Sequence, residues 1–301
     1  MSNNRDGLLV VDKVKGMSSF DVVRRVRGLA KTRKVGHTGT LDPDATGVLP
    51  VAIGRCTKLS KYLTLDDKRY SFTMKLGAAT TTDDSTGEVV RQAGFDHVTR
   101  ADVEALVPRF VGHIEQVPPV YSAIKVDGER AYARARKGED VQLEARTVRV
   151  DALEITGWDL PHIEMEVRCG PGTYVRSLAR DIGEALGSAA HTTAIHRSAV
   201  GPFTIDKAVS LQTLQEAEDI WEYVLTPMEM VSSLPRVPLD AEQTRRVGHG
   251  QRLVVERQWP LDTAVAAHDE DGRLVAVMIV EKREGNKSQL KPKRVLMPLR
   301  G

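Results

Sequence analysis

One loop of the sequence places a carboxylate among residues that fix the backbone. It runs Gly36-His37-Thr38-Gly39-Thr40-Leu41-Asp42-Pro43-Asp44-Ala45-Thr46-Gly47. Its glycines permit unusual backbone geometry, and Pro43 keeps Asp42 out of helical geometry. A carboxylate on such a braced loop, beside an apolar segment, has the setting that a nucleophile or a general base requires. An aspartate that only accepts hydrogen bonds within its own turn fits the same local pattern.

Metal and nucleotide-phosphate sites do not fit this loop. If Asp42 began a calcium loop, the twelfth position would be Ile53, where a bidentate glutamate is needed. No Gly-Lys-Ser/Thr follows the glycines, so the loop is not a Walker motif. His37 has no second ligand at metal spacing. We therefore expect no metal ion and no cofactor.

Basic residues are concentrated in two tracts, although the net charge is only +2. The 301 residues are 41% hydrophobic and 28% charged, which is ordinary for a globular protein of about two domains. The tracts consist of Arg24, Arg25, Arg27, Lys31, Arg33 and Lys34, and of Lys282, Arg283, Lys287, Lys291, Lys293, Arg294 and Arg300. They fit a polyanionic ligand, but ordinary solvated faces have a similar composition.

The spacing of the two cysteines and the polarity of the N-terminal residues indicate in which cellular compartment the protein resides. Cys56 and Cys169 are far apart in the sequence and have no metal-ligand spacing, which favours a reducing environment. The first seven residues are polar, and no apolar run approaches the roughly 20 residues that span a bilayer. We expect a cytoplasmic protein with no membrane contact.

Hydrophobic periodicity predicts both helices and strands. A first helix should begin at Ser18 or Ser19 and end near Ala30, with Phe20, Val23 and Val26 on its apolar face. Two more helices are expected near residues 100–110 and 174–186, the last closed by Gly187. Strands are expected at residues 8–12, 48–54, 69–76, 148–156 and 163–169.

Two further segments differ from this body. Residues 115–150 begin with Pro118-Pro119 and are interpreted as an inserted excursion with basic residues: Lys125, Arg130, Arg134, Arg136, Lys137, Arg146 and Arg149. From about residue 235, short β-rich stretches at 253–256, 264–267, 274–280 and 295–298 predict a small all-β domain. We therefore predict an α+β fold, with a catalytic body over residues 1–232 and a β domain over residues 235–301.

Five ordered motifs resemble those of the bacterial tRNA pseudouridine synthase B family. The loop continues as Ala45-Thr46-Gly47-Val48-Leu49-Pro50, and the other motifs are Asp12-Lys13-x-x-Gly16-Met17-Ser18-Ser19, Lys68-Arg69-Tyr70, Gly172-Thr173-Tyr174-Val175-Arg176-Ser177-Leu178, and Arg197 with Val200-Gly201-Pro202-Phe203. Tyr121-Ser122-Ala123-Ile124-Lys125 also resembles the base of the family's RNA-gripping insertion. There are three departures. Val14 stands where the family usually has proline, and His196 stands where arginine is frequent. Ala79-Thr80-Thr81-Thr82 precedes the acidic turn Asp83-Asp84, where the family often has Arg-Thr-Asp-Thr.

The resemblance implies a role for each matching residue. Asp42 would be the catalytic carboxylate, either attacking C1′, adding to C6 or taking the C2′ proton. Arg176 would hold this carboxylate through planar hydrogen bonds, and Tyr70 would stack on the base and relay the C5 proton. The substrate-binding residues would be His37, Lys13, Tyr174, Ile195 and Arg197; plain core packing is the alternative for Tyr174 and Ile195.

The resemblance also implies the fold and the substrate. The fold would be a pseudouridine synthase domain with a mixed or antiparallel sheet, followed over residues 235–301 by a PUA-type domain. The reaction would isomerise the T-loop uridine at position 55 of tRNA after base flipping. We expect a monomer that binds the T-arm and has no obligate protein partner.

Two other functions use the same features. The basic surfaces could anneal tRNA arms and so assist tRNA folding, with or without chemistry. A cofactor-free hydrolase would use Asp42 to release free uracil, but no second carboxylate or histidine is paired with Asp42 at a recognisable spacing.

Overall fold

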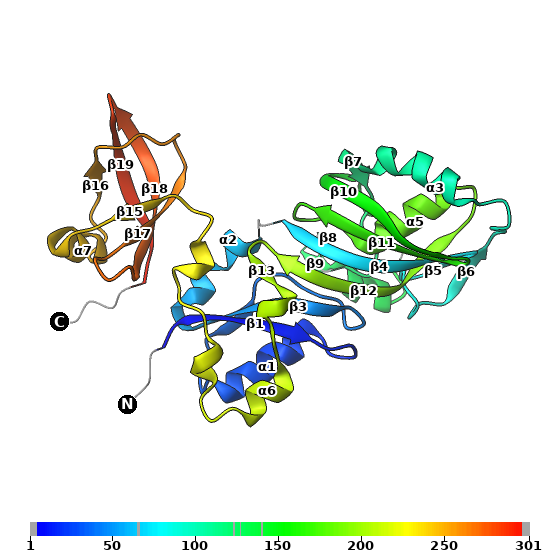
Figure 1. Ribbon diagram of the computed structural model, residues 1–301, viewed down its shortest axis with the longest axis horizontal. Helices are drawn as coiled ribbons and strands as arrows, with labels where there is room; N and C mark the ends of the chain where they lie inside the picture. Colours follow the sequence, from blue (N-terminus) through cyan, green and yellow to red (C-terminus); the bar gives the residue numbers. More distant parts are fainter. Residues whose placement is uncertain (1–4, 65–66, 123, 127, 140, 297–301) are drawn as a thin grey trace.

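Two separate β-sheets carry the architecture (Figure 1). The computed structural model describes residues 5–64, 67–122, 124–126, 128–139 and 141–296. Within them a ten-stranded mixed sheet has the order β14-β1-β3-β12-β4-β11-β10-β7, with β2 paired to β3 and β13 to β12. A five-stranded sheet has the order β15-β17-β18-β19-β16. The predicted α+β class with a mixed sheet is confirmed.

The N-terminal strand lies next to the strand that follows the Asp42 loop, residues 36–47. β1 (Gly7–Lys13) runs antiparallel to β3 (Thr46–Ile53), and β14 (Val209–Ser210) runs parallel on its other side. α1 (Ser19–Leu29) begins where predicted, because Ser18 and Asp21 form a capping box. Val23 and Val26 are buried as predicted, together with Ser19 and Val22, but the prediction for Phe20 was wrong, since its side chain is 59% exposed.

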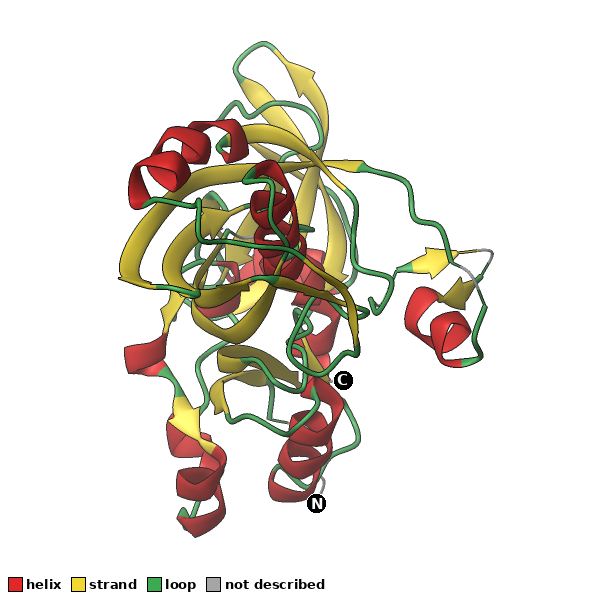
Figure 2. Ribbon diagram, turned by 90° about the vertical axis from the view of Figure 1, so that its right-hand side faces the viewer, coloured by secondary structure: helices red, strands yellow, loops and turns green. Residues whose placement is uncertain are grey.

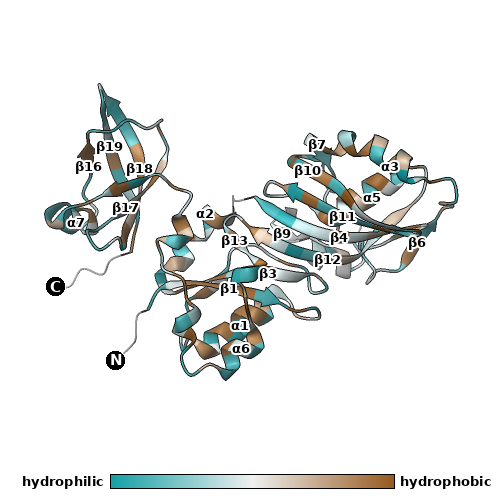
Figure 3. Ribbon diagram, in the orientation of Figure 1, coloured by the Kyte–Doolittle hydropathy of each residue, from teal (hydrophilic) through white to brown (hydrophobic). Residues whose placement is uncertain are grey.

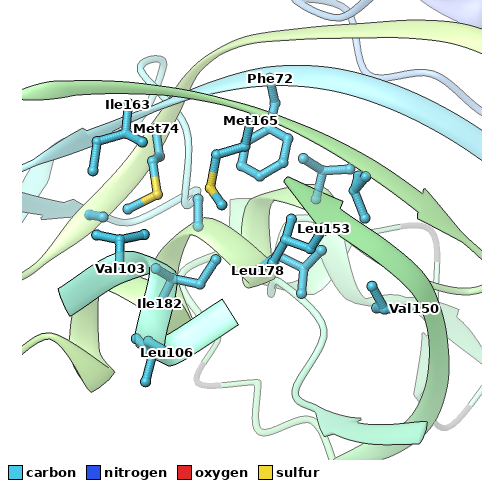
Figure 4. Close-up of a cluster of buried hydrophobic side chains, with 14 of the residues drawn as sticks. Phe72, Met74, Val103, Leu106, Val150, Leu153, Ile163, Met165, Leu178 and Ile182 are labelled. Carbon is cyan, nitrogen blue, oxygen red and sulfur yellow. The ribbon is translucent and has the colours of Figure 1, made fainter. Parts of the chain in front are cut away.

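Helix α5 (Val175–Ala185) packs on the other half of the sheet, beside α3 (Arg100–Leu106) (Figure 4). Its Leu178 and Ile182 meet Phe72 and Met74 of β4 (Lys68–Leu76) and Met165 of β11 (His162–Cys169). Figure 3 shows hydrophobic and hydrophilic residues alternating along β11. This apolar contact fixes the N-terminal end of α5, which carries Arg176, relative to the sheet.

The strand that joins the two halves was missed by the sequence analysis. β12 (Ala190–Val200) pairs parallel with β3 and antiparallel with β4. Its sequence contains His191, Thr192 and Arg197, all of which are buried, so it lacks the apolar alternation of a typical core strand. β12 therefore brings the loop that follows β2 (Val35–His37) close to the strand that carries Tyr70.

The excursion leaves the sheet after β7 (Gly112–Gln116) and returns in β10 (Arg146–Asp159), which pairs with β7. It contains the hairpin of β8 (Lys125–Val126) and β9 (Glu129–Arg130), followed by α4 (Ala131–Arg136). Figure 2 shows this hairpin and helix standing away from the rest of the molecule. The excursion is thus an insertion between two neighbouring strands, and its ends are held by the sheet.

The C-terminal sheet is formed by β15 (Arg236–Pro238), β16 (Leu253–Val255), β17 (Ala264–His268), β18 (Leu274–Glu284) and β19 (Lys287–Val295), with α7 (Ala241–Gly248). The last strand was placed wrongly at residues 295–298, of which 297 and 298 lie outside the described residues. The basic segment before them is the strand, since its Ser288 and Leu290 are buried between the charges. Ala266, Leu274 and Val277 share a core cluster with Leu8, Cys56 and Leu59 of the body and with Met228, Met230 and Val231 of the connecting segment.

The remaining described elements are short. They are α2 (Ser60–Thr64), β5 (Ala78–Thr80), β6 (Val89–Gln92), β13 (Phe203–Thr204), α6 (Leu211–Glu216) and single 3-10 turns at Gly54–Leu59, Val107–Phe110, Ile205–Lys207, Ile220–Tyr223 and Glu229–Val231. Across the described ranges, no helix is both long and apolar enough to cross a membrane.

Candidate active site

A cavity of about 280 Å³ lies between the Asp42 loop, strands β4 and β12, and the N-terminal end of α5. Its size is near the lower end of small-ligand sites. Six of the expected site residues line this cavity: Asp42, Tyr70, Tyr174, Arg176, Ile195 and Arg197. Segments more than 100 residues apart in the sequence therefore meet here.

Asp42 and Arg176 form an ion pair on the wall of this cavity. Arg176 Nε lies 3.0 Å from Asp42 Oδ2. The Arg176 side chain is 4% exposed, whereas that of Asp42 is 41% exposed. The guanidinium also donates to the carbonyl oxygens of Thr82 at 2.7 Å and Tyr121 at 2.9 Å. Arg176 is thus fixed by the protein, and the carboxylate that it holds still faces the open cavity.

Three buried polar side chains brace the loop on both sides of Asp42. The Ser19 hydroxyl accepts from Leu41 N at 2.8 Å and donates to Leu41 O at 2.9 Å. Lys13 Nζ donates to Pro43 O at 3.0 Å, to Met17 O at 2.7 Å and to Val14 O. Arg197 donates through Nε to Val48 O at 2.8 Å and through its terminal nitrogens to Thr40 O and Gly39 O. These contacts fix the backbone of the catalytic loop in place.

Lys13 and Arg197 were expected to bind substrate; both are buried, and their contact with substrate stays a prediction. Lys13 is fully buried, and burial lowers the pKa of its ammonium to about 8, against the opposing effect of Asp42 and Asp44. Arg197 is 1% exposed, and its donors face backbone carbonyl oxygens. Although Arg197 lines the cavity floor, its hydrogen bonds support the loop. In the structure both side chains hold the backbone of the Asp42 loop.

Tyr70 and Ile195 form one wall of the cavity and are packed against the hydrophobic core on both halves of the sheet. They lie on the neighbouring strands β4 and β12, so the sheet sets their spacing. Burial raises the pKa of the Tyr70 phenol, although Arg197 acts in the opposite direction. Tyr70 therefore presents a protonated phenol and an aromatic ring next to Asp42.

Tyr174 also lines the cavity and occupies the N-cap position of α5. Its side chain makes no capping hydrogen bond. Burial raises the pKa of its phenol. Tyr70 and Tyr174 together give the cavity aromatic surfaces, which suit a planar base.

His37 lies at the end of β2, where it is opposite Val51 of β3. It is half-buried and is not among the residues that line the cavity. The structure therefore places His37 beside the catalytic loop and outside the pocket itself, and contact with the extruded nucleotide stays a prediction.

The three departures from the family pattern fall in different places. Val14 is exposed after β1, while His196 Nδ1 lies 2.9 Å from the Thr46 hydroxyl. Near Thr81, the Asp84 carboxylate oxygen Oδ2 lies 3.5 Å from Arg176 Nη1. An acidic residue of this turn thus faces the Asp42–Arg176 pair.

Sequence reasoning missed Ser19 and Lys68 as site residues. Ser19 looked like a cap, but the cap is Ser18, and Ser19 turns inward to the loop. Lys68, at the start of β4, lines the cavity beside Gly170 and Gly172. Its place in the Lys68-Arg69-Tyr70 motif was the available signal. No cluster of three or more His, Cys, Asp or Glu side chains in the described part of the chain is arranged to hold a metal ion.

Comparison with known proteins identifies the family. The profile described as "TruB family pseudouridylate synthase (N terminal domain)" matches residues 27–175, and "tRNA pseudouridylate synthase B C-terminal domain" matches residues 176–232. The chain therefore belongs to the TruB family of pseudouridylate synthases, and it is an isomerase. The two matches meet inside α5 and end before the five-stranded sheet.

Individual relatives are similar over nearly the whole chain. The "tRNA pseudouridine synthase B" of Thermobifida fusca (strain YX) is 44% identical, covering 93% of this chain and 96% of that protein. The protein of the same name from Burkholderia mallei (strain NCTC 10247) is 45% identical over 90% of this chain and 92% of its own length. The crystal structure of the archaeal box H/ACA sRNP Nop10-Cbf5 complex aligns with a TM-score of 0.75 at 26% identity, covering 97% of this chain and 86% of that chain.

Proposed function

We propose that this chain isomerises the T-loop uridine at position 55 of tRNA to pseudouridine, with Asp42 as the catalytic carboxylate. The names of the relatives support tRNA as the substrate. The observation that carries the assignment of Asp42 is its ion pair with the buried Arg176 in a cavity walled by tyrosines. The protein acts as a cytoplasmic monomer in this proposal, without an obligate protein partner.

The reaction needs one carboxylate and no redox partner. The N1–C1′ bond of uridine breaks, the base turns over, and C5 bonds to C1′. C5 then loses its proton and N1 gains one, so atoms and electrons balance within the nucleotide. Asp42 acts on the sugar–base unit, and the Tyr70 phenol lies on the same cavity to relay the proton from C5.

The cavity accounts for how a flipped base is held. Extrusion costs on the order of a few kcal/mol. Tyr70, Tyr174 and Ile195 offer stacking and apolar surface that offset this cost. Once the base covers Asp42, water no longer solvates the carboxylate, and Arg176 becomes its main source of charge stabilisation.

Basic side chains outside the cavity are proposed to contact phosphates of the T-arm. They lie on α1, on the excursion and on the five-stranded sheet, which we propose is a PUA-type domain. Some are partly neutralised: Arg24 pairs with Asp21, Arg134 with Glu139 and Lys137 with Glu129. Counterion release still predicts that the RNA dissociation constant rises steeply with salt. An affinity unchanged across a tenfold range of salt would contradict phosphate contact.

One experiment tests the whole proposal. An unmodified tRNA transcript is incubated with the enzyme, and pseudouridine is mapped at nucleotide resolution, with a transcript carrying cytidine at position 55 as the control. Conversion at position 55 is expected, and Asp42→Asn should abolish it while RNA binding persists. Release of free uracil would point to a hydrolase. Binding and annealing of tRNA arms by wild type without conversion would leave only the tRNA-folding function.

A further inference from the structure

The last residue of β7 contacts the backbone of Tyr174. Gln116 is 1% exposed and stands where the chain leaves the sheet to form the excursion. Its Nε2 donates to Tyr174 O at 3.1 Å, and its Oε1 accepts from Tyr174 N at 2.8 Å. Both ends of one side-chain amide are thus paired with the two backbone groups of one cavity residue.

Tyr174 depends on this contact because it begins α5 without a cap of its own. The N–H groups at the start of a helix have no partner within the helix, and the Tyr174 side chain accepts no capping hydrogen bond. Gln116 is the residue that fixes the Tyr174 peptide from outside the helix. Two residues later α5 carries Arg176, which holds Asp42.

Neighbouring contacts tie the same two segments together. Val117 O accepts from Ser177 Oγ at 2.8 Å and from an Arg180 nitrogen at 2.7 Å. Tyr121 O accepts from Arg176 at 2.9 Å. The root of the excursion, residues 116–121, is therefore joined to the first half of α5 along its length. Gln116 is the one of these root residues whose side chain makes the connection.

We infer that Gln116 is a positioning residue for the uridine pocket. It fixes Tyr174 to the root of the excursion, so the position of that root determines the position of the Tyr174 ring. This inference rests on the proposed function, since it supposes that the ring meets an extruded uridine. It requires no contact between Gln116 and RNA. The buried amide acts only through Tyr174.

Gln116→Met tests the inference, because methionine has a similar size and cannot make either hydrogen bond. Misplacement of a pocket wall should lower the single-turnover rate at saturating tRNA on the order of 10- to 100-fold. The dissociation constant for tRNA should change less than threefold, because Gln116 is buried and neither Gln116 nor Tyr174 is proposed to contact a phosphate. Gln258→Met is the matched control: Gln258 donates to Gly285 O at 2.7 Å in the C-terminal sheet, and its loss should leave the rate unchanged.

A spectroscopic readout separates positioning from folding. With 3-fluorotyrosine introduced at position 174, Gln116→Met should shift the fluorine resonance of the free enzyme, and Gln258→Met should not. If Gln116→Met fails to fold, Gln116→Glu takes its place with the same expected losses, since it keeps the acceptor and loses the donor. A wild-type rate together with an unshifted resonance would overturn the inference while the proposed function stands. Failure of the wild-type enzyme to convert uridine would instead sink the proposed function.

Discussion

Replacing Arg176 by methionine removes the guanidinium that holds Asp42, and the structure sets the size of the loss. Arg176 Nε lies 3.0 Å from the carboxylate, and hydrogen bonds to charged groups contribute about 1.5–3 kcal/mol. In the free enzyme Asp42 is 41% exposed, so water replaces part of this contact. Under a flipped base water is excluded and the upper value applies. A loss of about 3 kcal/mol in the transition state corresponds to a fall in kcat of about 150-fold.

The assay compares Arg176→Met with Arg176→Lys and wild type in single-turnover conversion of a tRNA transcript. Lysine keeps the charge but cannot contact Asp42 and the carbonyl oxygens of Thr82 and Tyr121 in one plane, so an intermediate rate is expected. Because two carbonyl oxygens also lose their donor, the free energy of unfolding in urea should fall by about 2–3 kcal/mol.

A clear result would refute this reasoning. If Arg176→Met remains folded in urea titrations and converts uridine within threefold of the wild-type rate, then Arg176 does not support the carboxylate during the reaction. If kcat is unchanged and only the dissociation constant for tRNA rises, Arg176 contacts the RNA instead.

Three further predictions concern the loop and the wall of the cavity. Ser19→Ala should lower kcat about tenfold, because both backbone groups of Leu41 lose their partner. Ser18→Ala should lower only the free energy of unfolding, by about 1 kcal/mol, because α1 loses its cap. Equal kinetic effects of the two variants would contradict the assignment. Raising the pH through about 8 should deprotonate Lys13 and leave one of its three carbonyl partners without a donor, so conversion should decline near pH 8 in wild type and not in Lys13→Met. The effect on stability has the opposite sign. Between pH 8 and 10.5 the Lys13 amine is protonated in the unfolded chain and deprotonated in the folded protein, so the free energy of unfolding rises with pH in this range. If the Tyr70 phenol relays a proton, Tyr70→Phe should keep the RNA affinity and lower the rate about 100-fold or more. Tyr70→Leu should lower both the affinity and the rate. A wild-type rate for the phenylalanine variant would leave Tyr70 only a stacking role.

The elements that the sequence predicted well are those with strong local signals. The capping signal at Ser18 or Ser19 and the apolar periodicity of residues 174–186 placed α1 and α5 within about one residue of their observed starts. Residues 163–169 alternate strictly and form β11. Local patterns determine these elements, and no distant residue is needed to interpret them.

The parts that failed depend on contacts between distant residues. β12 has a polar sequence because its His191 and Arg197 find backbone carbonyl partners in β5, in β3 and in the Asp42 loop. The burial of Lys13 is likewise invisible in the sequence, since its carbonyl partner at Pro43 is supplied by the loop itself. Gln116 had no signal at all, because its partner, the Tyr174 peptide, is identified by position and not by residue type.

The strand order has a consequence for how the enzyme is made. β1 and β3 are early in the chain, but their neighbours β14 and β12 are among the last strands of the large sheet to be synthesised. At about 5–20 residues per second, Arg197 leaves the ribosome on the order of 10–30 s after Asp42. During that interval the catalytic loop lacks Arg176 and Arg197, the two arginines that hold it and its carboxylate. A nascent chain therefore carries a complete loop sequence without an active site, and it cannot modify RNA near the ribosome until most of the protein has been released.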